Sequence, residues 1–168
     1  SRNMYTKGEY VVKANTGVCV VEDILLRRLT ENSDEKEYYC LAPIADSRAK
    51  VFVPVDSDKS NLRKAMDKTE AEALIHAIPS IETKWIESDK SREQEYKNAM
   101  RSNDPVALVA IIKNLYFRNK DRLNHGKKVT SIDDRYFKLA ENALYSEIAH
   151  ALDKKTEEMK ELIAHSIA

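Results

Sequence analysis

The pattern of apolar residues divides the chain into two parts that meet near Asp67. Before about residue 56, apolar residues form short β-branched and aromatic runs separated by turn residues, a pattern typical of strands. Two of these runs flank Asn15-Thr16-Gly17, where the glycine can supply the positive φ of a hairpin turn. Further runs cover residues 24–26, 38–41 and 51–55. Four or five strands this short favour a small, strongly bent Tudor- or SH3-like β-barrel, because an open sheet would leave strand edges exposed.

From residue 69 onward, apolar positions recur with the 3.6-residue period of helices. Thr69 and Glu72 have the spacing of a capping box, which predicts the start of a helix that Pro79 ends. Asp104 followed by Pro105 is the preferred order at a helix start, and the helix that follows is the most apolar in the chain. The expected helices cover residues 69–78, 88–101, 105–123, 131–152 and a short segment after residue 153.

These elements predict an α+β protein with two domains. Residues 4–66 are expected to form the β-barrel, residues 67–88 a connecting helix and linker, and residues 89–168 an all-α bundle. The core of the bundle is expected to contain Tyr96, Leu115, Tyr116 and Phe137.

The charges are balanced overall, with 28 basic and 28 acidic residues, but they are unevenly distributed along the chain. Residues 84–138 hold 13 basic and 8 acidic residues, a net charge of +5. The segments before and after carry net charges of −1 (residues 1–78) and −3 (residues 139–168). A basic centre of this kind indicates contact with a polyanion or, alternatively, an ordinary solvated helical surface.

The sequence holds few groups from which a catalytic site can be built. Its three glycines are scattered, which excludes a glycine-rich phosphate loop, and its four histidines share no metal-ligand spacing. Cys19 and Cys40 lie in apolar, strand-like surroundings and are expected to be small buried residues rather than ligands or disulfide partners. We therefore expect no enzyme activity, no metal site and no cofactor. The longest apolar run has seven residues and nothing resembles a signal peptide, so a cytoplasmic location is expected.

The order of several short motifs resembles the CarD/CdnL family of bacterial transcription regulators. In the first half the resemblance rests on residues 5–12, 16–24, 37–41 and 50–55, the last of which ends in a Val-Pro pair followed by valine. In the second half it rests on residues 102–105, 115–118 and 134–137. The N-terminal module of this family also occurs as the polymerase-interacting domain of the transcription–repair coupling factor. No single motif is diagnostic, and the ordered series across both halves carries the resemblance.

The resemblance implies a non-enzymatic transcription regulator with two partners. The barrel is expected to bind the β subunit of RNA polymerase, and the helical domain is expected to contact promoter DNA at the upstream edge of the melted region. Together these contacts would stabilise the open complex, because two weak contacts in one chain gain effective concentration from their linkage. Backbone and minor-groove contacts are expected on the DNA side.

The resemblance also implies which residues of the barrel contact the polymerase. Arg27 matches a polymerase-contacting arginine of actinobacterial relatives, although a plain surface cation beside Arg28 is the alternative. Phe52 occupies a second contact position that is arginine in those relatives, and Lys50 is assigned to the same surface. If Val51 and Val53 belong to the core, the alternation of a strand places Phe52 on the opposite face, where an aromatic favours an interface.

The expected DNA contacts are less directly aligned with the family. Relatives place a wedge tryptophan early in the first helix of the second domain, where this chain has Arg92 or Asp89, depending on the alignment. Trp85 is then either a displaced wedge or a residue that packs the linker against the bundle. Lys127 and Lys128 fit either phosphate contacts or a solvated turn. The full set assigned to DNA is Trp85, Arg92, Lys97, Arg118, Lys127, Lys128 and Arg135.

A different class of function fits the same residues. A protein-interaction adaptor with a Tudor-like module would use its helical domain to bind another protein rather than DNA. The net charge of +5 favours the regulator, whereas the absence of an aromatic at the wedge position favours the adaptor.

Overall fold

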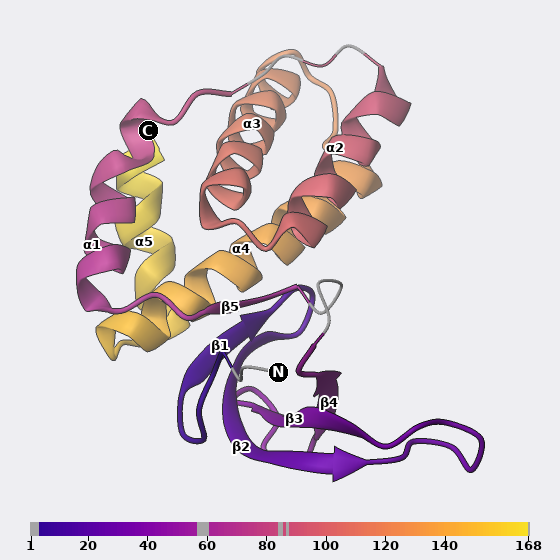
Figure 1. Cartoon of the computed structure of the whole chain (residues 1–168). Coiled ribbons are helices and arrows are strands. Elements are labelled where there is room, and N and C mark those ends of the chain that lie inside the picture. The colour runs from indigo at the N-terminus through magenta and orange to yellow at the C-terminus, as the bar shows by residue number, and fades with distance from the viewer. Residues whose placement is uncertain (1–3, 57–60, 84–85, 87, 168) are drawn as a thin grey trace. The chain divides into compact units, whose positions relative to one another are not determined.

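The computed structural model describes residues 4–56, 61–83, 86 and 88–167. The chain divides into two compact units, an N-terminal unit (Ser1–Ala65) and a helical unit (Met66–Ala168), and each is described by itself. Figure 1 labels the elements of both units. About 52% of the described residues are helical, which agrees with the predicted α+β class.

The N-terminal unit is built on an antiparallel sheet of five strands in the order β4-β3-β2-β1-β5. Its strands are β1 (Tyr10–Lys13), β2 (Gly17–Arg27), β3 (Lys36–Pro43), β4 (Val51–Pro54) and β5 (Leu62–Lys64). The predicted hairpin at Asn15-Thr16-Gly17 joins β1 to β2, and Gly17 has a φ of +99°. Among the described residues, the edge strands β4 and β5 do not pair with each other, so the sheet is open and the predicted barrel is not confirmed.

A β-bulge in β2 explains why two apolar runs that the sequence separates belong to a single strand. The pairing with β3 shifts by one residue between Val21 and Asp23, which leaves Glu22 as the extra residue. Because of this shift, Val21 and Ile24 both face the same apolar cluster although they are three positions apart, a spacing that would put them on opposite faces of a regular strand. The cluster is the core of the unit and consists of Val11, Cys19, Val21, Tyr39, Leu41 and Val53, with partly buried neighbours around it.

The described residues of the helical unit form five α-helices and a short 3₁₀ turn, η1 (Ile78–Ser80). The helices are α1 (Lys68–Ala77), α2 (Asp89–Ser102), α3 (Pro105–Asn124), α4 (Ser131–Leu152) and α5 (Thr156–Ile167). The predicted start of α3 is confirmed, since the Asp104 side chain accepts a hydrogen bond from the amide of Val106. The predicted capping box at Thr69 and Glu72 is wrong: the box is formed by Asp67 and Glu70, two residues earlier.

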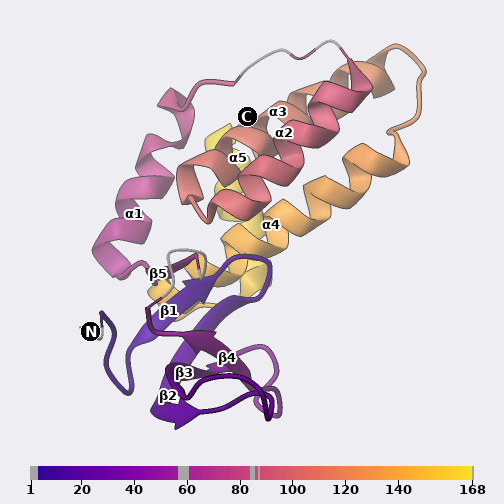
Figure 2. The ribbon, with the colours of Figure 1, turned by 45° about the vertical axis from the view of Figure 1, so that its right-hand side comes forward.

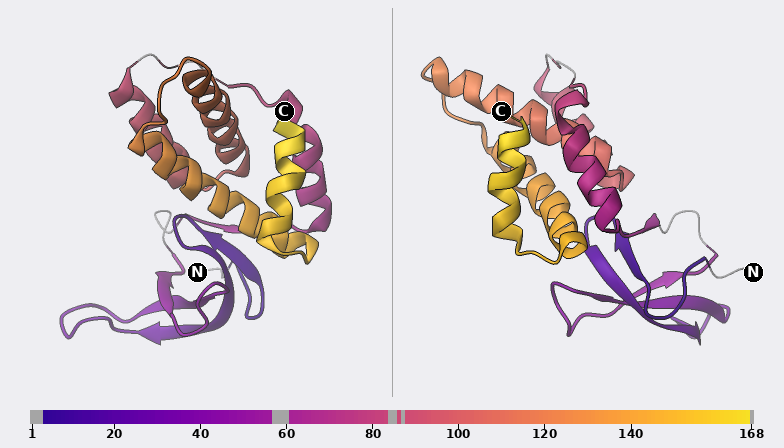
Figure 3. Two further views of the ribbon diagram at one scale, coloured as in Figure 1. Left: turned by 180° about the vertical axis from the view of Figure 1, so that it is seen from behind. Right: turned by 90° about the vertical axis from the view of Figure 1, so that its left-hand side faces the viewer.

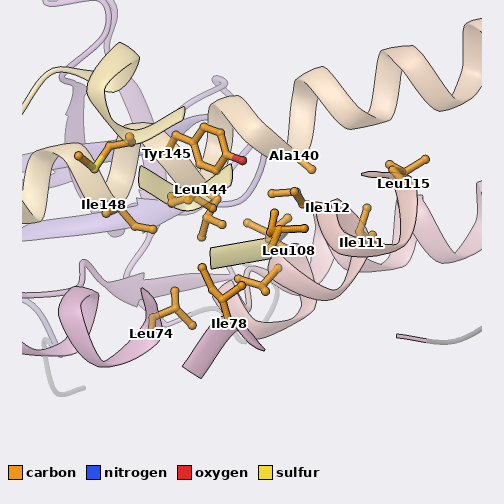
Figure 4. Close-up of a cluster of buried hydrophobic side chains, with 14 of the residues drawn as sticks. Leu74, Ile78, Leu108, Ile111, Ile112, Leu115, Ala140, Leu144, Tyr145 and Ile148 are labelled. Carbon is orange, nitrogen blue, oxygen red and sulfur yellow. The ribbon is translucent and has the colours of Figure 1, made fainter. Parts of the chain in front are cut away.

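Apolar faces of α1, α2, α3, α4 and α5 meet in one core. Leu74 and Ile78 project toward side chains of α3 and α4, as Figure 4 shows. Figure 2 shows α2 and α3 side by side, and Figure 3 shows α5 beside α1, in agreement with their contacts. Tyr96 and Leu115 are fully buried as expected, and Tyr116 and Phe137 pack against the core from partly buried positions. Helix α1 is thus part of the helical unit's core.

Candidate functional site

Arg27 and Phe52 form a stacked pair on the face of the sheet that lies opposite the core of the N-terminal unit. Val53 belongs to that core and Val51 packs against it. Phe52 pairs with Cys40 across β3, so its side chain points to the other face, where it is half-buried. The guanidinium carbon of Arg27 lies 4.7 Å from the centre of the Phe52 ring. This is cation–π distance, and it holds a cation and an aromatic ring together at an accessible surface.

Lys50 directly precedes the edge strand β4 and forms an ion pair with Glu22, the bulge residue of β2. The two side chains are 43% and 39% exposed. An ion pair this exposed is screened by solvent and contributes at most ~1 kcal/mol, so it can exchange for a charged partner at little cost. The residues expected to contact polymerase therefore present two cations and one aromatic ring.

The residues expected to contact DNA fall into two groups in the helical unit. Trp85 lies outside the described residues. Lys97 is exposed and lies 3.8 Å from Glu93, one turn earlier on α2. The other exposed members are Lys127, Lys128 and Arg135. Arg92 and Arg118, by contrast, are withdrawn from the surface.

Arg92 directs its guanidinium into the helical unit. The residue is 6% exposed, forms an ion pair with Asp89 at the start of the same helix, and donates to the carbonyl of Ile86 over 3.4 Å. Its charge is thus already paired with a carboxylate of the same helix, and we leave Arg92 out of the surface proposed below.

Arg118 is part of a buried polar network that joins α2, α3 and α4. Its Nε donates to the carboxylate of Asp133 over 2.8 Å, and the hydroxyl of Tyr96 donates to the other carboxylate oxygen over 2.8 Å. Burial raises the pKa of Asp133, but hydrogen bonds from Arg118, Tyr96 and Thr130 outweigh it and leave this pKa below its ordinary value. Burial, together with the bond to Asp133, raises the pKa of Tyr96. The sequence analysis assigned Arg118 to phosphate contact and did not predict this network.

Several cations lie close together in sequence where α3 ends. We call Lys120, Arg122, Lys127 and Lys128 the basic turn. Residues 118–138 contain seven basic and three acidic residues, and one of the acids, Asp133, is buried against Arg118. Lys120 and Arg122 had not been singled out from the sequence, although both lie in the segment with a net charge of +5.

Backbone hydrogen bonds fix the shape of the basic turn. The amide of Lys127 donates to the carbonyl of Arg122 over 2.8 Å, and the amide of Gly126 donates to that of Leu123 over 3.1 Å. Gly126 has a φ of +72°, so the helix ends in a Schellman motif. The Arg122 Nε also donates to the carbonyl of Lys128 over 2.9 Å. The lysines that follow the helix are therefore presented from a defined backbone.

Two further buried charges have structural roles in the helical unit. The ammonium of Lys113 donates to the carbonyls of Ile78 and Ile81 over 2.8 and 2.7 Å, and thereby caps the end of the α1–η1 segment. The carboxylate of Glu147 accepts a hydrogen bond from the amide of Met66 over 2.9 Å, just before α1. These contacts tie the first helix of the unit to α3 and α4.

Two hollows lie among the described residues of the helical unit, and neither of them gathers a catalytic set of groups. One, of about 600 Å³, lies between α1 and α5 and is lined by Ile75, Pro79, Leu152 and Leu162 with a few polar residues. The other, of about 310 Å³, lies between α2 and α3. Within the described ranges, no group of three or more His, Cys, Asp or Glu residues is arranged to hold a metal ion. None of the helices in these ranges is long and apolar enough to span a membrane.

Both halves of the chain match family models. The model of the CarD-like/TRCF RID domain matches residues 5–66, and the model of the CarD C-terminal domain matches residues 73–164. The chain belongs to the CarD family. No curated protein matches it. As a member of this family, it is a transcription-related protein that interacts with RNA polymerase. The domains of the CarD family are non-catalytic interaction and regulatory modules.

Proposed function

We propose that this CarD-family protein binds the β subunit of RNA polymerase through residues 4–66 and promoter DNA through residues 89–168 of the helical unit. The DNA contact lies near the upstream edge of the melted region and stabilises the open complex. Neither contact has to be strong, because a chain that holds one partner raises the effective concentration of its other surface near the second.

The stacked pair of Arg27 and Phe52 is the observation that carries the polymerase side of the proposal. Arginine and aromatic residues are enriched at the centres of protein interfaces, where they supply most of the binding energy. The ring restrains the arginine side chain in one place, which lowers the entropy lost when it pairs with a carboxylate of the partner. Lys50 extends this surface along the edge strand.

The DNA side of the proposal rests on the basic turn together with Lys97 and Arg135. Cations spread along a helix end and the following turn suit contacts with successive phosphates, which position a protein without reading sequence. Phosphate contact of this kind fits a regulator that acts at many promoters through the state of the DNA.

The decisive experiment measures binding of the full chain to the isolated β-subunit lobe that docks the N-terminal unit. Arg27→Glu is expected to lower the affinity by roughly tenfold or more, the loss typical of a central interface arginine. Arg48→Glu is the matched control, because the Arg48 side chain is 94% exposed in another turn of the same unit and forms an exposed ion pair with Asp46. Equal affinities of wild-type protein and Arg27→Glu would overturn the assignment of this surface.

One observation favours the adaptor as the second candidate function. Two of the basic residues that the family resemblance assigned to DNA, Arg92 and Arg118, are engaged in ion pairs inside the helical unit. Retention on nonspecific duplex DNA at low salt separates the two functions. Retention that is lost in Lys127→Glu/Lys128→Glu supports the regulator, and absence of retention in the wild-type protein supports the adaptor.

A further inference from the structure

The hollow of about 310 Å³ between α2 and α3 has the size and the lining of a small-molecule site. Pockets that bind small molecules have volumes of roughly 300–1,000 Å³ and mostly apolar walls, with a few polar groups that orient the ligand. The residues that line this hollow all belong to the helical unit. Six of the eleven are apolar or aromatic: Ile86, Tyr96, Ala99, Ala107, Ala110 and Ile111.

Short side chains keep this hollow open. Helices α2 and α3 are joined by a two-residue connection and lie side by side (Figure 2). Ala107 and Ala110, three residues apart on one face of α3, line the hollow together with Ala99 of α2. The hydroxyl of Ser102, which also lines it, donates to the carbonyl of Ala99 over 2.7 Å and is thus turned back onto its own helix. Since protein interiors leave few voids larger than a water molecule, a hollow of this volume is room that neither helix fills.

The charged residues at the hollow have one sign. Glu82 and Glu95 line it, both are exposed, and no basic residue lines it among the described residues. Neither carboxylate forms an ion pair with another described residue, in contrast to Glu93 of the same helix, which lies 3.8 Å from Lys97. The negative charge at the hollow is therefore available to a ligand.

The lining defines the chemistry of a matching ligand. Repulsion from two carboxylates disfavours phosphates and other anions, and attraction to them favours a cation. The apolar walls favour a ligand whose remaining part is hydrocarbon, because its burial removes apolar surface from water. The larger hollow between α1 and α5 gives no such indication, since Glu72, His76 and Lys154 line it together.

We propose that the hollow between α2 and α3 binds a small organic amine, with its ammonium group beside Glu82 and Glu95 and its apolar body against the alanines of the two helices. This site goes beyond the contacts proposed above, in which cations of the protein meet a polymerase subunit and DNA. A ligand that binds only the folded helical unit also stabilises it, so the melting temperature should rise with the ligand concentration.

The test measures binding of three small molecules that share an indole body to the full chain, by isothermal titration calorimetry. Tryptamine carries an ammonium group at neutral pH, tryptophol a neutral hydroxyl and indole-3-propionate a carboxylate. Tryptamine is expected to bind most tightly, and tryptophol about fivefold more weakly, which is the loss expected for an exposed ion pair. Indole-3-propionate is expected to show no measurable binding. Equal affinities for tryptamine and tryptophol would overturn the proposed class of ligand.

Two variants test the location of the site. Glu82→Gln/Glu95→Gln keeps the shape of the hollow and should lower the affinity for tryptamine to that for tryptophol. Ala107→Leu/Ala110→Leu fills the hollow and should abolish binding of both molecules. Tryptamine affinity that is unchanged in both variants would overturn the site, as would a wild-type protein that does not bind tryptamine.

Matched controls and a second measurement separate binding from folding. Glu161→Gln changes an exposed acid of α5 and Ala73→Leu an exposed alanine of α1, both outside the hollow, and both variants should bind tryptamine as wild type does. Thermal unfolding followed by circular dichroism checks that each variant is folded. Tryptamine should raise the melting temperature of the wild-type protein more than that of Glu82→Gln/Glu95→Gln. An equal rise in these two proteins would overturn the site even if the leucine variant does not fold.

Discussion

Arg118 and Asp133 form a buried ion pair that joins α3 to the first turn of α4, with 2.8 Å between the guanidinium Nε and the carboxylate. Their side chains are 13% and 2% exposed. Tyr96 of α2 donates to the same carboxylate, so one acidic side chain connects three helices. The region of the helical unit that presents the basic turn is therefore held by a polar network rather than by apolar packing alone.

Removing the carboxylate charge should destabilise the helical unit. Asp133→Asn leaves the Arg118 charge buried without its counterion, and we expect the free energy of unfolding to fall by about 3 kcal/mol. Urea unfolding followed by circular dichroism measures the change. Lys138→Met breaks an exposed ion pair with Asp134 on the same helix and should cost at most ~1 kcal/mol. Equal losses in the two variants would contradict a structural role of the network.

The network should also make stability depend on pH in the acid range. The pKa of Asp133 is lower in the folded protein than in the unfolded chain, where it is about 3.9, so the unfolded state binds the proton more readily. The stabilisation is complete above about pH 5 and is lost as pH falls below 4 through the folded pKa. The difference in unfolding free energy between wild type and Asp133→Asn should therefore stay constant from pH 7 to 5 and shrink below pH 4. A difference that grows with falling pH would contradict the sign.

Lys113 should determine how firmly α1 is held to the helical unit. Its ammonium donates to carbonyls of Ile78 and Ile81, and Lys113→Met removes these bonds while it keeps a chain of similar length. Since a hydrogen bond to a charged group contributes ~1.5–3 kcal/mol, hydrogen exchange in α1 should become faster by at least tenfold. Lys120→Met changes an exposed lysine of the same helix and should leave exchange in α1 unchanged.

The sequence was sufficient to predict elements whose signals are local. The hairpin at Gly17 and the start of α3 at Asp104 depend on turn and cap residues that act within a few positions, and both are confirmed. The bulge at Glu22 broke the alternation of β2, and this made one strand look like two. Strand β5 (Leu62–Lys64) has too little apolar pattern to be predicted, because its pairing with β1 decides its conformation.

The candidate site shows where local signals end. Asp133 lies in the first turn of α4, yet it is buried because Tyr96, 37 residues away in sequence, and Arg118 converge on it. In the amino-acid sequence, Arg92, Arg118 and Lys128 are three basic residues with the same charge. Tertiary packing turns the first two inward and leaves the third exposed, and no pattern along the chain distinguishes them.

The salt dependence of DNA binding should identify which cations contact phosphates. Each phosphate contact that is lost reduces the slope of log K against log salt by about 0.9 for duplex DNA. Lys127→Ala/Lys128→Ala should therefore make the slope shallower by about two units. The matched control is Lys154→Ala/Lys155→Ala, because these two lysines are also exposed and also follow a helix end. The amide of Lys154 donates to the carbonyl of Ala149, five residues earlier, as the amide of Lys127 does to the carbonyl of Arg122. The two control lysines lie in the segment with a net charge of −3, so the control should leave the slope unchanged. Equal reductions by both pairs would mean that DNA responds to the overall charge of the protein, and the basic turn would lose its assignment as the phosphate-binding surface.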